Sequence, residues 1–452
     1  MRARDELRAL IGLAAPLMLG QGGIMLMGVV DTMVIGRSTP LDMAGVALGN
    51  GVVSAITVFG LGLSMGIEPL SAQAFGAGER AAARTWMWQG VWLALMISGP
   101  LIVLALLAPL TFASSGISPE LASTATRYIY GRLPSIPMVA MMAALRAYRS
   151  STGGRWSILL AVGTANVINL LLCLALVFGW AGLPKLGALG TALATSSASV
   201  GLVLVLAIAI RIDRLSAEDA AQVVRRPEKA RIRRVFSLGW PIGAHGMAET
   251  GVFVAVAWAI GATGETLLAA HSVAVTLASL TFMMALGIAN AATARVGMYI
   301  GRGEGLFARR AGFYAIALGA VFMGTAGLGF QLAPDALASL FTPEPAVIAA
   351  SLPLVVIAGV FALSDGIQGV ASGALRGAGD TAWPFWTNLV AHWLVGLPVG
   401  WWLATRHHLG PSGYWWGLTA GLTVVALVLF TRFAWLSRRP IARLSSDESG
   451  AP

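Results

Sequence analysis

The stretch FSLGWPIGAHGMAETGVFVAVAWAIG (residues 236–261) is apolar along most of its length and carries a carboxylate, Glu249, at its middle. As an α-helix, roughly 26 residues rise about 39 Å, which exceeds the ~30 Å hydrocarbon core of a bilayer. A carboxylate at the centre of a membrane helix costs on the order of 2.5–3.5 kcal/mol. We therefore expect Glu249 to face a wet cavity or a partner inside a membrane protein.

The composition of the whole chain is typical of a polytopic membrane protein. Apolar residues make up 57% and charged residues only 11% of the 452 positions, and the mean hydropathy is +0.78, far above that of a soluble domain. Thirty Lys and Arg exceed twenty Asp and Glu, but they lie mainly in loops, so no nucleic acid partner is expected. One cysteine, Cys173, allows neither an internal disulfide nor a Cys/His metal cluster.

Apolar runs between charged or Gly/Pro breaks predict two sets of six membrane spans. Lys and Arg concentrate in the loops that would be cytoplasmic if the N-terminus were inside, and only Arg37, Lys185 and Arg406 would lie outside. The positive-inside rule therefore predicts that both termini are cytoplasmic. The predicted spans are residues 10–36, 44–73, 86–109, 121–148, 157–180, 187–211, 235–261, 267–300, 310–333, 346–375, 384–405 and 413–436.

The two sets of spans repeat each other at an offset of about 225 residues. Six spans per set bring both sets in from the same side, which predicts a parallel repeat with a site at the interface of the two lobes. We expect an N-lobe at 1–211, a cytoplasmic basic linker at 212–234, a C-lobe at 235–437 and a cytoplasmic tail at 438–452. The matching positions include Pro16 with Pro241, Gly78-Glu79 with Gly303-Glu304, Gly153 with Gly379 and Gly187 with Gly410.

Four acids fall inside predicted spans, namely Asp31, Glu68, Glu249 and Asp365. Each would be costly against lipid, so each should point inward, unless it lies at a helix end or is neutralised by a local hydrogen bond. For Glu68, which is followed by Pro69 near the cytoplasmic end of its span, a structural role is the competing interpretation. At the repeat offset Asp31 and Glu249 do not coincide, so each lobe has its own acids.

These acids provide a physical basis for antiport. A low-dielectric cavity disfavours ionisation of a carboxyl group, which can then exchange a proton, Na⁺ or a cationic ligand. The sequence contains no P-loop, GxSxG or HExxH motif, so energy must come from an ion gradient or a partner. We expect no catalytic residue and no cofactor besides H⁺ or Na⁺ as the coupling ion.

Histidines inside the spans are candidates for proton relays. His245 precedes Glu249 by one helical turn, so the two side chains can share a face. A histidine that merely packs between helices is the alternative, and it applies equally to His271 and His392, each alone in its span. No spacing of residues predicts a metal cluster.

Four motifs resemble those of the multidrug and toxic compound extrusion (MATE) family of exporters. They are Gly20-Gln21, MGVVDTMVIG (27–36), PLSAQAFGAGE (69–79) with Gln73, and SDGIQGVASGALRGAGDT (364–381). Acids in the first, seventh and tenth spans are the pattern of its NorM-like branch. The resemblance covers nearly the whole chain except residues 212–232 and those after 437.

The resemblance implies an all-α integral membrane fold with twelve transmembrane helices in two pseudo-symmetric six-helix lobes, which form a V around a central cavity. It implies export of cationic, amphipathic drugs or metabolites in exchange for H⁺ or Na⁺. By motif position, Glu249 and Asp365 would form the C-lobe cation site, where Na⁺ could bind, and Asp31 the N-lobe acid. Asn169 matches an asparagine near that acid, and His245, Glu68 and Gln73 would support the sites.

Two positions depart from the family pattern. Cys173 stands one turn after Asn169, where many relatives have a polar or acidic residue, which weakens the N-lobe site. Phe361 stands one turn before Asp365, where some Na⁺-coupled relatives have tyrosine. The missing phenolic oxygen favours H⁺ over Na⁺.

The sequence thus predicts a secondary antiporter of a bacterial-type inner membrane, with small organic cations and membrane lipids as partners and no obligatory protein partner. A flippase for lipid-linked precursors is the alternative within transport, and it would need basic side chains in its cavity, for which Arg127, Arg132 and Arg295 are the candidates. An integral membrane enzyme is the alternative from another class. The acids lie on separate helices without an adjacent nucleophile or metal-ligand set, which argues against it.

Overall fold

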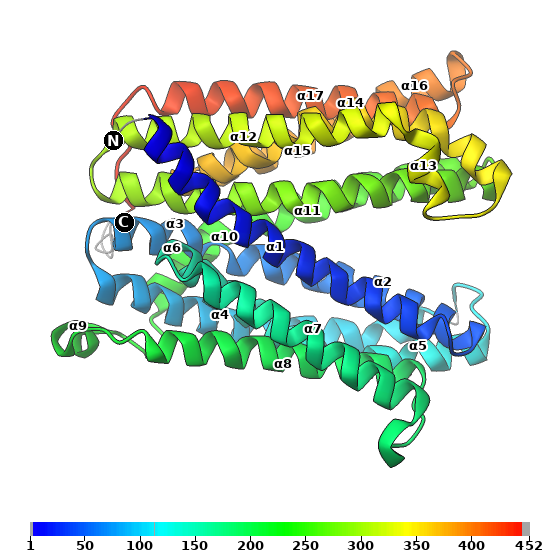
Figure 1. The fold of residues 1–452 in the computed structure, drawn as a ribbon, viewed down its shortest axis with the longest axis horizontal. Helices are drawn as coiled ribbons and strands as arrows, with labels where there is room; N and C mark the ends of the chain where they lie inside the picture. Colours follow the sequence, from blue (N-terminus) through cyan, green and yellow to red (C-terminus); the bar gives the residue numbers. More distant parts are fainter. Residues whose placement is uncertain (1–2, 113, 445–452) are drawn as a thin grey trace. The chain divides into compact units, whose positions relative to one another are not determined.

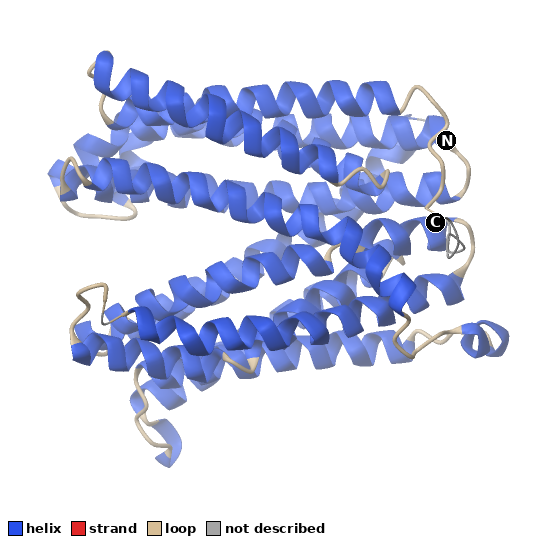
Figure 2. Ribbon diagram, turned by 180° about the vertical axis from the view of Figure 1, so that it is seen from behind, coloured by secondary structure: helices blue, strands red, loops and turns tan. Residues whose placement is uncertain are grey.

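The computed structural model describes residues 3–112 and 114–444, and these residues form helices and loops without a strand (Figures 1 and 2). This confirms the predicted all-α class. The principal helices are α1 (Ala3–Ile35), α2 (Pro40–Ser64), α3 (Ile67–Gly76), α4 (Arg80–Leu107), α5 (Pro119–Arg132), α6 (Ser135–Ser151), α7 (Arg155–Phe178), α8 (Ala188–Ile212), α9 (Ala217–Gln222), α10 (Lys229–Gly261), α11 (Glu265–Gly301), α12 (Gly305–Leu332), α13 (Pro334–Ser339), α14 (Pro345–Gly377), α15 (Ala382–Val390), α16 (Leu397–Arg406) and α17 (Pro411–Leu436). Short 3-10 helices η1 (Ala108–Thr111) and η2 (Trp180–Gly182) and a π-helix, η3 (Ala391–Gly396), complete the list.

Nine helical segments in the described part of the chain are long and apolar enough to cross a membrane, with α2 and α3 counted as one. The other three predicted spans are also helical. Span 121–148 is α5 with α6, broken at Leu133 and Pro134, where proline removes an N–H donor. Span 384–405 is α15, η3 and α16, and α10 carries His245 and Glu249, which lower its hydropathy.

The predicted repeat is visible in the lengths and turns of the helices. α1 and α10 each have 33 residues, and α4 and α12 each have 28. The turn glycines that match in sequence have the same left-handed backbone, which a side chain rarely adopts. The paired φ angles are 84° and 75° at Gly78 and Gly303, 81° and 86° at Gly153 and Gly379, and 50° and 53° at Gly187 and Gly410.

Contacts divide the described helices into two units. One unit contains the residues up to Met18 and Ala244–Leu444, and the other contains Leu19–Gly243. The first halves of α1 and α10 therefore belong to a different unit from their second halves. The lobe boundaries expected from the sequence, 1–211 and 235–437, and the tail at 438–452, stay predictions, and residues 445–452 of that tail lie outside the described residues.

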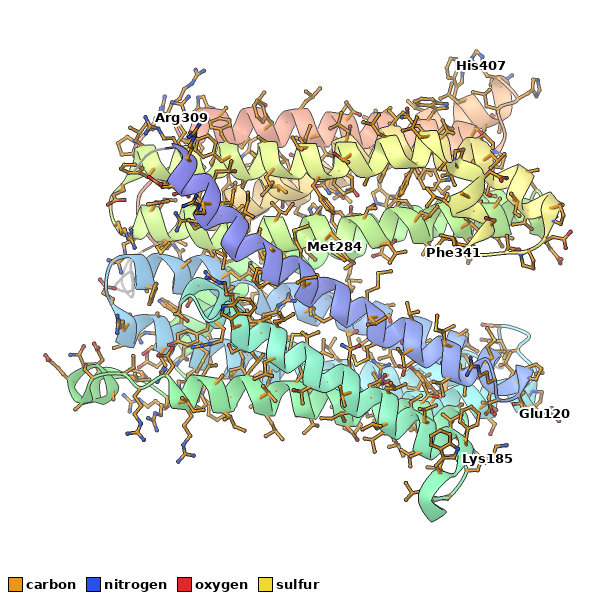
Figure 3. All side chains as sticks on the ribbon, viewed as in Figure 1. Glu120, Lys185, Met284, Arg309, Phe341 and His407 are labelled. Atoms are coloured by element: carbon orange, nitrogen blue, oxygen red, sulfur yellow. The ribbon has the colours of Figure 1, made fainter. Side chains whose placement is uncertain are left out.

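In the 19–243 unit, glycines bring α2 and the first half of α10 into backbone contact. A Cβ atom at Gly239 would lie 2.0 Å from the carbonyl oxygen of Leu63, and one at Gly66 would lie 2.4 Å from that of Val235. Such small-residue contacts allow helices to pack closely where lipid offers no hydrophobic driving force. Glu120, in the first turn of α5, and Lys185, in the loop before α8, lie at the same end of the unit (Figure 3).

In the other unit α11, α12, α14 and α17 run side by side (Figures 1 and 2). Arg309, at the start of α12, lies at one end of these helices, whereas Phe341 and His407 lie at the opposite end (Figure 3). This placement agrees with helices that cross the unit in alternating directions.

The predicted linker, residues 212–234, is partly held on α4. Gln89 donates to the carbonyl oxygen of Arg226 at 2.9 Å and accepts from the backbone N–H of Glu228 at 2.8 Å. The indole of Trp92 donates to the carbonyl oxygen of Arg225 at 2.7 Å. Polar side chains along one face of α4 therefore replace the missing backbone partners of this extended segment.

Candidate cation-binding sites

Asp31 of α1 lies in a polar pocket closed by α7 and α8. Its side chain is 6% exposed, Oδ1 accepts from Asn169 Nδ2 at 2.9 Å, and Oδ2 accepts from Thr195 Oγ1 at 2.6 Å. The structure thus brings the predicted pair Asp31 and Asn169 together. Thr195 was not predicted from the sequence. Several Ser and Thr residues occur in α8, as is common in membrane helices, and their spacing does not single out Thr195.

The Asp31 pocket has further polar neighbours. Asn169 Oδ1 is buried without a hydrogen-bond partner among the described residues. The Arg132 guanidinium interacts electrostatically with Asp31 and donates to the Tyr128 hydroxyl at 2.8 Å. Cys173 is buried beside Thr191, with sulfur and hydroxyl 3.9 Å apart. Hydroxyls of α8 therefore supply the polarity that Cys173 lacks.

Glu249 and Asp365 belong to a second cluster, in the other unit. Glu249 Oε2 lies 3.6 Å from His245 Nε2 on the same face of α10, and Asp365, 4% exposed on α14, interacts electrostatically with Glu249. Gln368 donates a long 3.4 Å hydrogen bond to Asp365 Oδ1. Two carboxylates from helices far apart in sequence thus share one site, with limited donor support.

His392 adds a second imidazole to the Glu249 cluster. It is fully buried in the π-helix η3, and it interacts electrostatically with Glu249. Its Nδ1 lies 3.3 Å from the carbonyl oxygen of Asn388, which can only accept, so we assign the ring proton to Nδ1. Nε2, buried without a partner among the described residues, is then an acceptor for a proton. π-Bulges are frequent at functional sites.

Aromatic rings border this cluster one turn from each carboxylate. Phe361 packs edge-on against Phe253 and Trp415, with ring centroids 6.1 Å and 5.9 Å apart. The Trp415 indole donates to His271 Nδ1 at 3.2 Å. The position that could hold a tyrosine oxygen is therefore filled by hydrocarbon contacts.

Glu68 and Gln73 lie in α3, and both are buried. Glu68 occupies the first turn of α3, where a carboxylate is stabilised by the helix dipole. This position fits the structural interpretation of Glu68, and the support that Glu68 and Gln73 would give to the sites stays a prediction. Among residues 3–112 and 114–444, no group of three His, Cys, Asp or Glu could hold a metal ion.

Two of the three arginines that a flippase would need are paired or exposed, and the third, Arg132, lies beside Asp31. Arg295 forms a two-point ion pair with Glu6, with nitrogen to oxygen distances of 3.0 Å and 2.5 Å. Arg132 binds Tyr128 and Asn50, and Arg127 is exposed. The ionisable groups of the Glu249 cluster are acids and histidines, so that site has no basic lining of the kind a flippase would need.

Comparison with known proteins assigns the chain to a family. The MatE family model matches residues 16–175 and 241–402, one segment in each half of the repeat. A probable multidrug resistance protein NorM of Pseudomonas putida is 35% identical over 445 residues, 97% of this chain and 96% of that protein. The multidrug resistance protein PmpM of Pseudomonas aeruginosa is 34% identical, over 100% of this chain and 96% of that protein.

Solved structures share the fold at lower identity. The crystal structure of the eukaryotic MATE transporter AtDTX14 matches with a TM-score of 0.87 and 21% identity, covering 97% of this chain and 98% of that one. A MOP superfamily transporter from Pyrococcus furiosus, described as having a binding pocket of reverse polarity that suggests a different function, matches with a TM-score of 0.86, 20% identity and 96% coverage of both chains. These likenesses show the twelve-helix, two-lobe fold alone. On the family match and the relatives at about 35% identity, this chain is a multi-pass membrane protein that belongs to the NorM-like branch of the MATE family of transporters.

Proposed function

We propose that this chain is a secondary active antiporter that exports cationic, amphipathic drugs or metabolites in exchange for H⁺. The observation that carries the proposal is the shared site of Glu249 and Asp365, with His245 and His392 beside it. Two acids and two imidazoles in a membrane helix bundle can bind a proton or a cation. Each bound positive charge lowers the affinity of the site for the other, so the two compete. The names of the relatives, multidrug resistance proteins NorM, PmpM and MdtK, support efflux of small organic compounds.

H⁺ is favoured over Na⁺ by the ligands around Asp365. Na⁺ is a hard cation, bound best by several oxygens, and Phe361 contributes an aromatic edge where an oxygen would be needed. His392 Nε2 is a proton acceptor and not a hard oxygen ligand. Asp31, with Asn169 and Thr195, is a second carboxylate that we propose to exchange protons, and no further cofactor is required.

The proposal includes the placement of the protein. We propose that it lies in the inner membrane with both termini cytoplasmic, because Lys and Arg concentrate in the corresponding loops. Lipids and small organic cations are its expected partners, and no obligatory protein partner is required. The flippase alternative is disfavoured because Arg295 is neutralised by Glu6, and an enzymatic activity is disfavoured because the described residues around Glu249 and Asp365 include no serine, threonine or cysteine hydrogen-bonded to either acid.

Efflux of a fluorescent organic cation from proteoliposomes tests the proposal. An imposed pH gradient should drive efflux and a Na⁺ gradient should not. Glu249→Gln and Asp365→Asn should each lower the initial rate at least tenfold, because a carboxamide cannot exchange a proton.

Glu265→Gln is the matched control, since Glu265 is an exposed acid in the first turn of α11. It should transport as the wild type does. Transport driven only by Na⁺ would overturn the assignment of H⁺, and full activity of both carboxamide variants would overturn the site.

A further inference from the structure

A cavity of about 410 Å³ lies in the 244–444 unit, where the turn from α11 to α12 meets the end of α17. Arg309, Arg438 and Arg439 line it, together with Gly305 and Leu306 at the start of α12. Arg309 marks this end of the unit, opposite Phe341 and His407 (Figure 3). None of the residues that line the cavity belongs to the Glu249 cluster.

The three arginines have no carboxylate partner in the part of the chain that the structure describes. Arg309 contacts the Phe313 ring at 5.7 Å, and Arg439 contacts the Trp435 ring at 5.0 Å. No acid among the described residues lies within ion-pair distance of any of the three, although Arg295 and Arg432 in the same unit are paired with Glu6 and Asp380. Within the described residues the cavity is therefore positively charged without an ion-paired acid, which favours an anionic ligand.

The backbone at the cavity adds donors of the same kind. α12 has 28 residues and begins at Gly305. The backbone N–H groups of Phe307 and Ala308 bond to Glu304, but those of Gly305 and Leu306 have no acceptor among the described residues. The first N–H groups of a long helix form an anion-binding end with a partial positive charge.

Exposed apolar side chains border the cavity on the membrane-length helices. Leu306 is 58% exposed and Trp435 is 47% exposed. Farther along the same seam, Phe313 of α12 packs edge-on against Phe430 and Phe433 of α17, with centroid distances of 5.6 Å and 5.5 Å. A free anion needs only the arginines, whereas an anionic lipid would use both the arginines and this apolar seam.

We propose that this cavity binds the phosphate headgroup of an anionic phospholipid, with its acyl chains against the seam of α12 and α17. Arginine guanidinium groups present parallel N–H donors that match two phosphate oxygens. Basic pockets between membrane helices are a recurrent form of headgroup site. The proposal concerns a site separate from the cation exchange, and it holds whichever ion drives transport.

Lipid binding to the purified full chain tests the proposal. Native mass spectrometry would count bound lipids during titration with phosphatidylglycerol or phosphatidylcholine, and inorganic phosphate would be added as a competitor. We expect phosphatidylglycerol to bind at least tenfold more tightly than phosphatidylcholine. The triple variant Arg309→Gln, Arg438→Gln, Arg439→Gln should lose at least tenfold in phosphatidylglycerol affinity, since each basic residue near a lipid surface contributes about 1 kcal/mol and about 1.4 kcal/mol is tenfold.

Arg310→Gln is the matched control, because Arg310 is exposed on the next position of α12, contacts the Phe307 ring and does not line the cavity. It should bind phosphatidylglycerol as the wild type does. Equal affinity of the wild type for the two lipids would overturn the proposal without any variant. A loss in Arg310→Gln equal to that of the triple variant would reduce the site to general surface charge, and complete displacement by millimolar phosphate would assign the cavity to a free anion instead.

Discussion

At the scale of single residues, His271 and His392 have different surroundings although each is the lone histidine of its helix. His271 Nδ1 accepts a hydrogen bond from Trp415 Nε1 at 3.2 Å, inside a cluster of aromatic and aliphatic side chains. His392 has a buried Nε2 without a partner among the described residues and interacts electrostatically with Glu249. His271 is therefore placed to stabilise the fold, and His392 to take part in ion exchange.

Phenylalanine substitutions should separate these two roles. His271→Phe leaves the buried Trp415 N–H without an acceptor, which should lower the free energy of unfolding by about 1–3 kcal/mol and leave the transport rate per folded molecule nearly unchanged. His392→Phe removes a buried group that is already unpaired at Nε2, so it should cost less stability but lower gradient-driven efflux at least tenfold. Thermal unfolding in detergent and proteoliposome efflux measure the two quantities.

The same two assays can contradict the roles assigned to His392 and His271. If His392→Phe exported the organic cation at the wild-type rate, His392 would be a packing residue and the site would reduce to its carboxylates. If His271→Phe unfolded at the wild-type temperature, the Trp415 hydrogen bond would carry no net stability.

The sequence predicted a neighbour of Asp31 where a family motif contains it. It did not predict a neighbour that only tertiary packing brings close. Asn169 was expected beside Asp31 from the family motif, and the two side chains are 2.9 Å apart. Thr195 is closer to Asp31, at 2.6 Å, but no motif distinguishes it from the other hydroxyl residues of α8. Only the packing of α8 against α1 selects it.

At the scale of elements, the sequence predicted where helices are but not where they break. Leu133 and Pro134 divide one predicted span, and η3 interrupts another at His392 and Trp393. The Trp393 indole donates to the carbonyl oxygen of Ala248, next to Glu249, at 3.1 Å. A hydrogen bond between two helices depends on how they pack, so the periodicity and the length of apolar runs do not predict it.

The segment that connects the two halves shows a similar difference. The sequence presents residues 223–228 as part of a basic linker, yet their backbone is bound by Thr85, Gln89 and Trp92 of α4. Thr85, Gln89 and Trp92 are four and three residues apart, so they share one face of α4. We call this hydrogen-bonding face the polar track of α4.

Weakening this track should expose the segment to protease. Trypsin can cut after Arg225 but not readily after Arg226, which precedes Pro227. Trp92→Phe removes the 2.7 Å bond to the Arg225 carbonyl oxygen, and Gln89→Leu removes three bonds to the segment, so local opening should become easier. We expect cleavage after Arg225 to be about fivefold faster in Trp92→Phe, at roughly 1 kcal/mol per hydrogen bond, and faster still in Gln89→Leu. Peptide mapping during limited digestion measures it.

Trp88→Phe provides the matched control in the same helix, because no hydrogen bond from the Trp88 side chain to the segment is present among the described residues. It should be cut at the wild-type rate. Equal cleavage rates in Trp92→Phe, Gln89→Leu and the wild type would mean that the hydrogen bonds to α4 do not hold the segment closed.

At the scale of the whole molecule, length and hydropathy alone identify nine membrane-crossing segments among the described residues, whereas the repeat requires twelve. The three additional passes are α5 with α6, α10, and α15 with α16, and each is interrupted or carries polar side chains. The sequence predicted the repeat because turn glycines recur. The structure explains the recurrence at Gly78 and Gly303, since both have a positive φ angle, which favours glycine. The sequence predicted these three passes from apolar runs together with the repeat, and a hydropathy threshold alone misses them.

Cysteine labelling of loops should distinguish twelve passes from nine. The native Cys173 is fully buried, so an impermeant maleimide should react only with introduced cysteines. Lys185, Arg214, Arg302 and His407 are exposed loop or turn positions. With twelve passes and a cytoplasmic N-terminus, Lys185→Cys and His407→Cys should label in intact cells, and Arg214→Cys and Arg302→Cys only after permeabilisation.

Each competing topology gives a different labelling pattern. If only the nine apolar segments crossed the membrane from a cytoplasmic N-terminus, Arg214→Cys would label from outside, and Lys185→Cys, Arg302→Cys and His407→Cys would not. Twelve passes from an external N-terminus would expose both Arg214→Cys and Arg302→Cys instead. Because Arg302 separates the last two cases and Lys185 separates both from the expected one, four variants decide the number of passes and the orientation together. An external Arg302→Cys would also place the basic cavity beside Arg309 at the outer leaflet and overturn the cytoplasmic position of both termini.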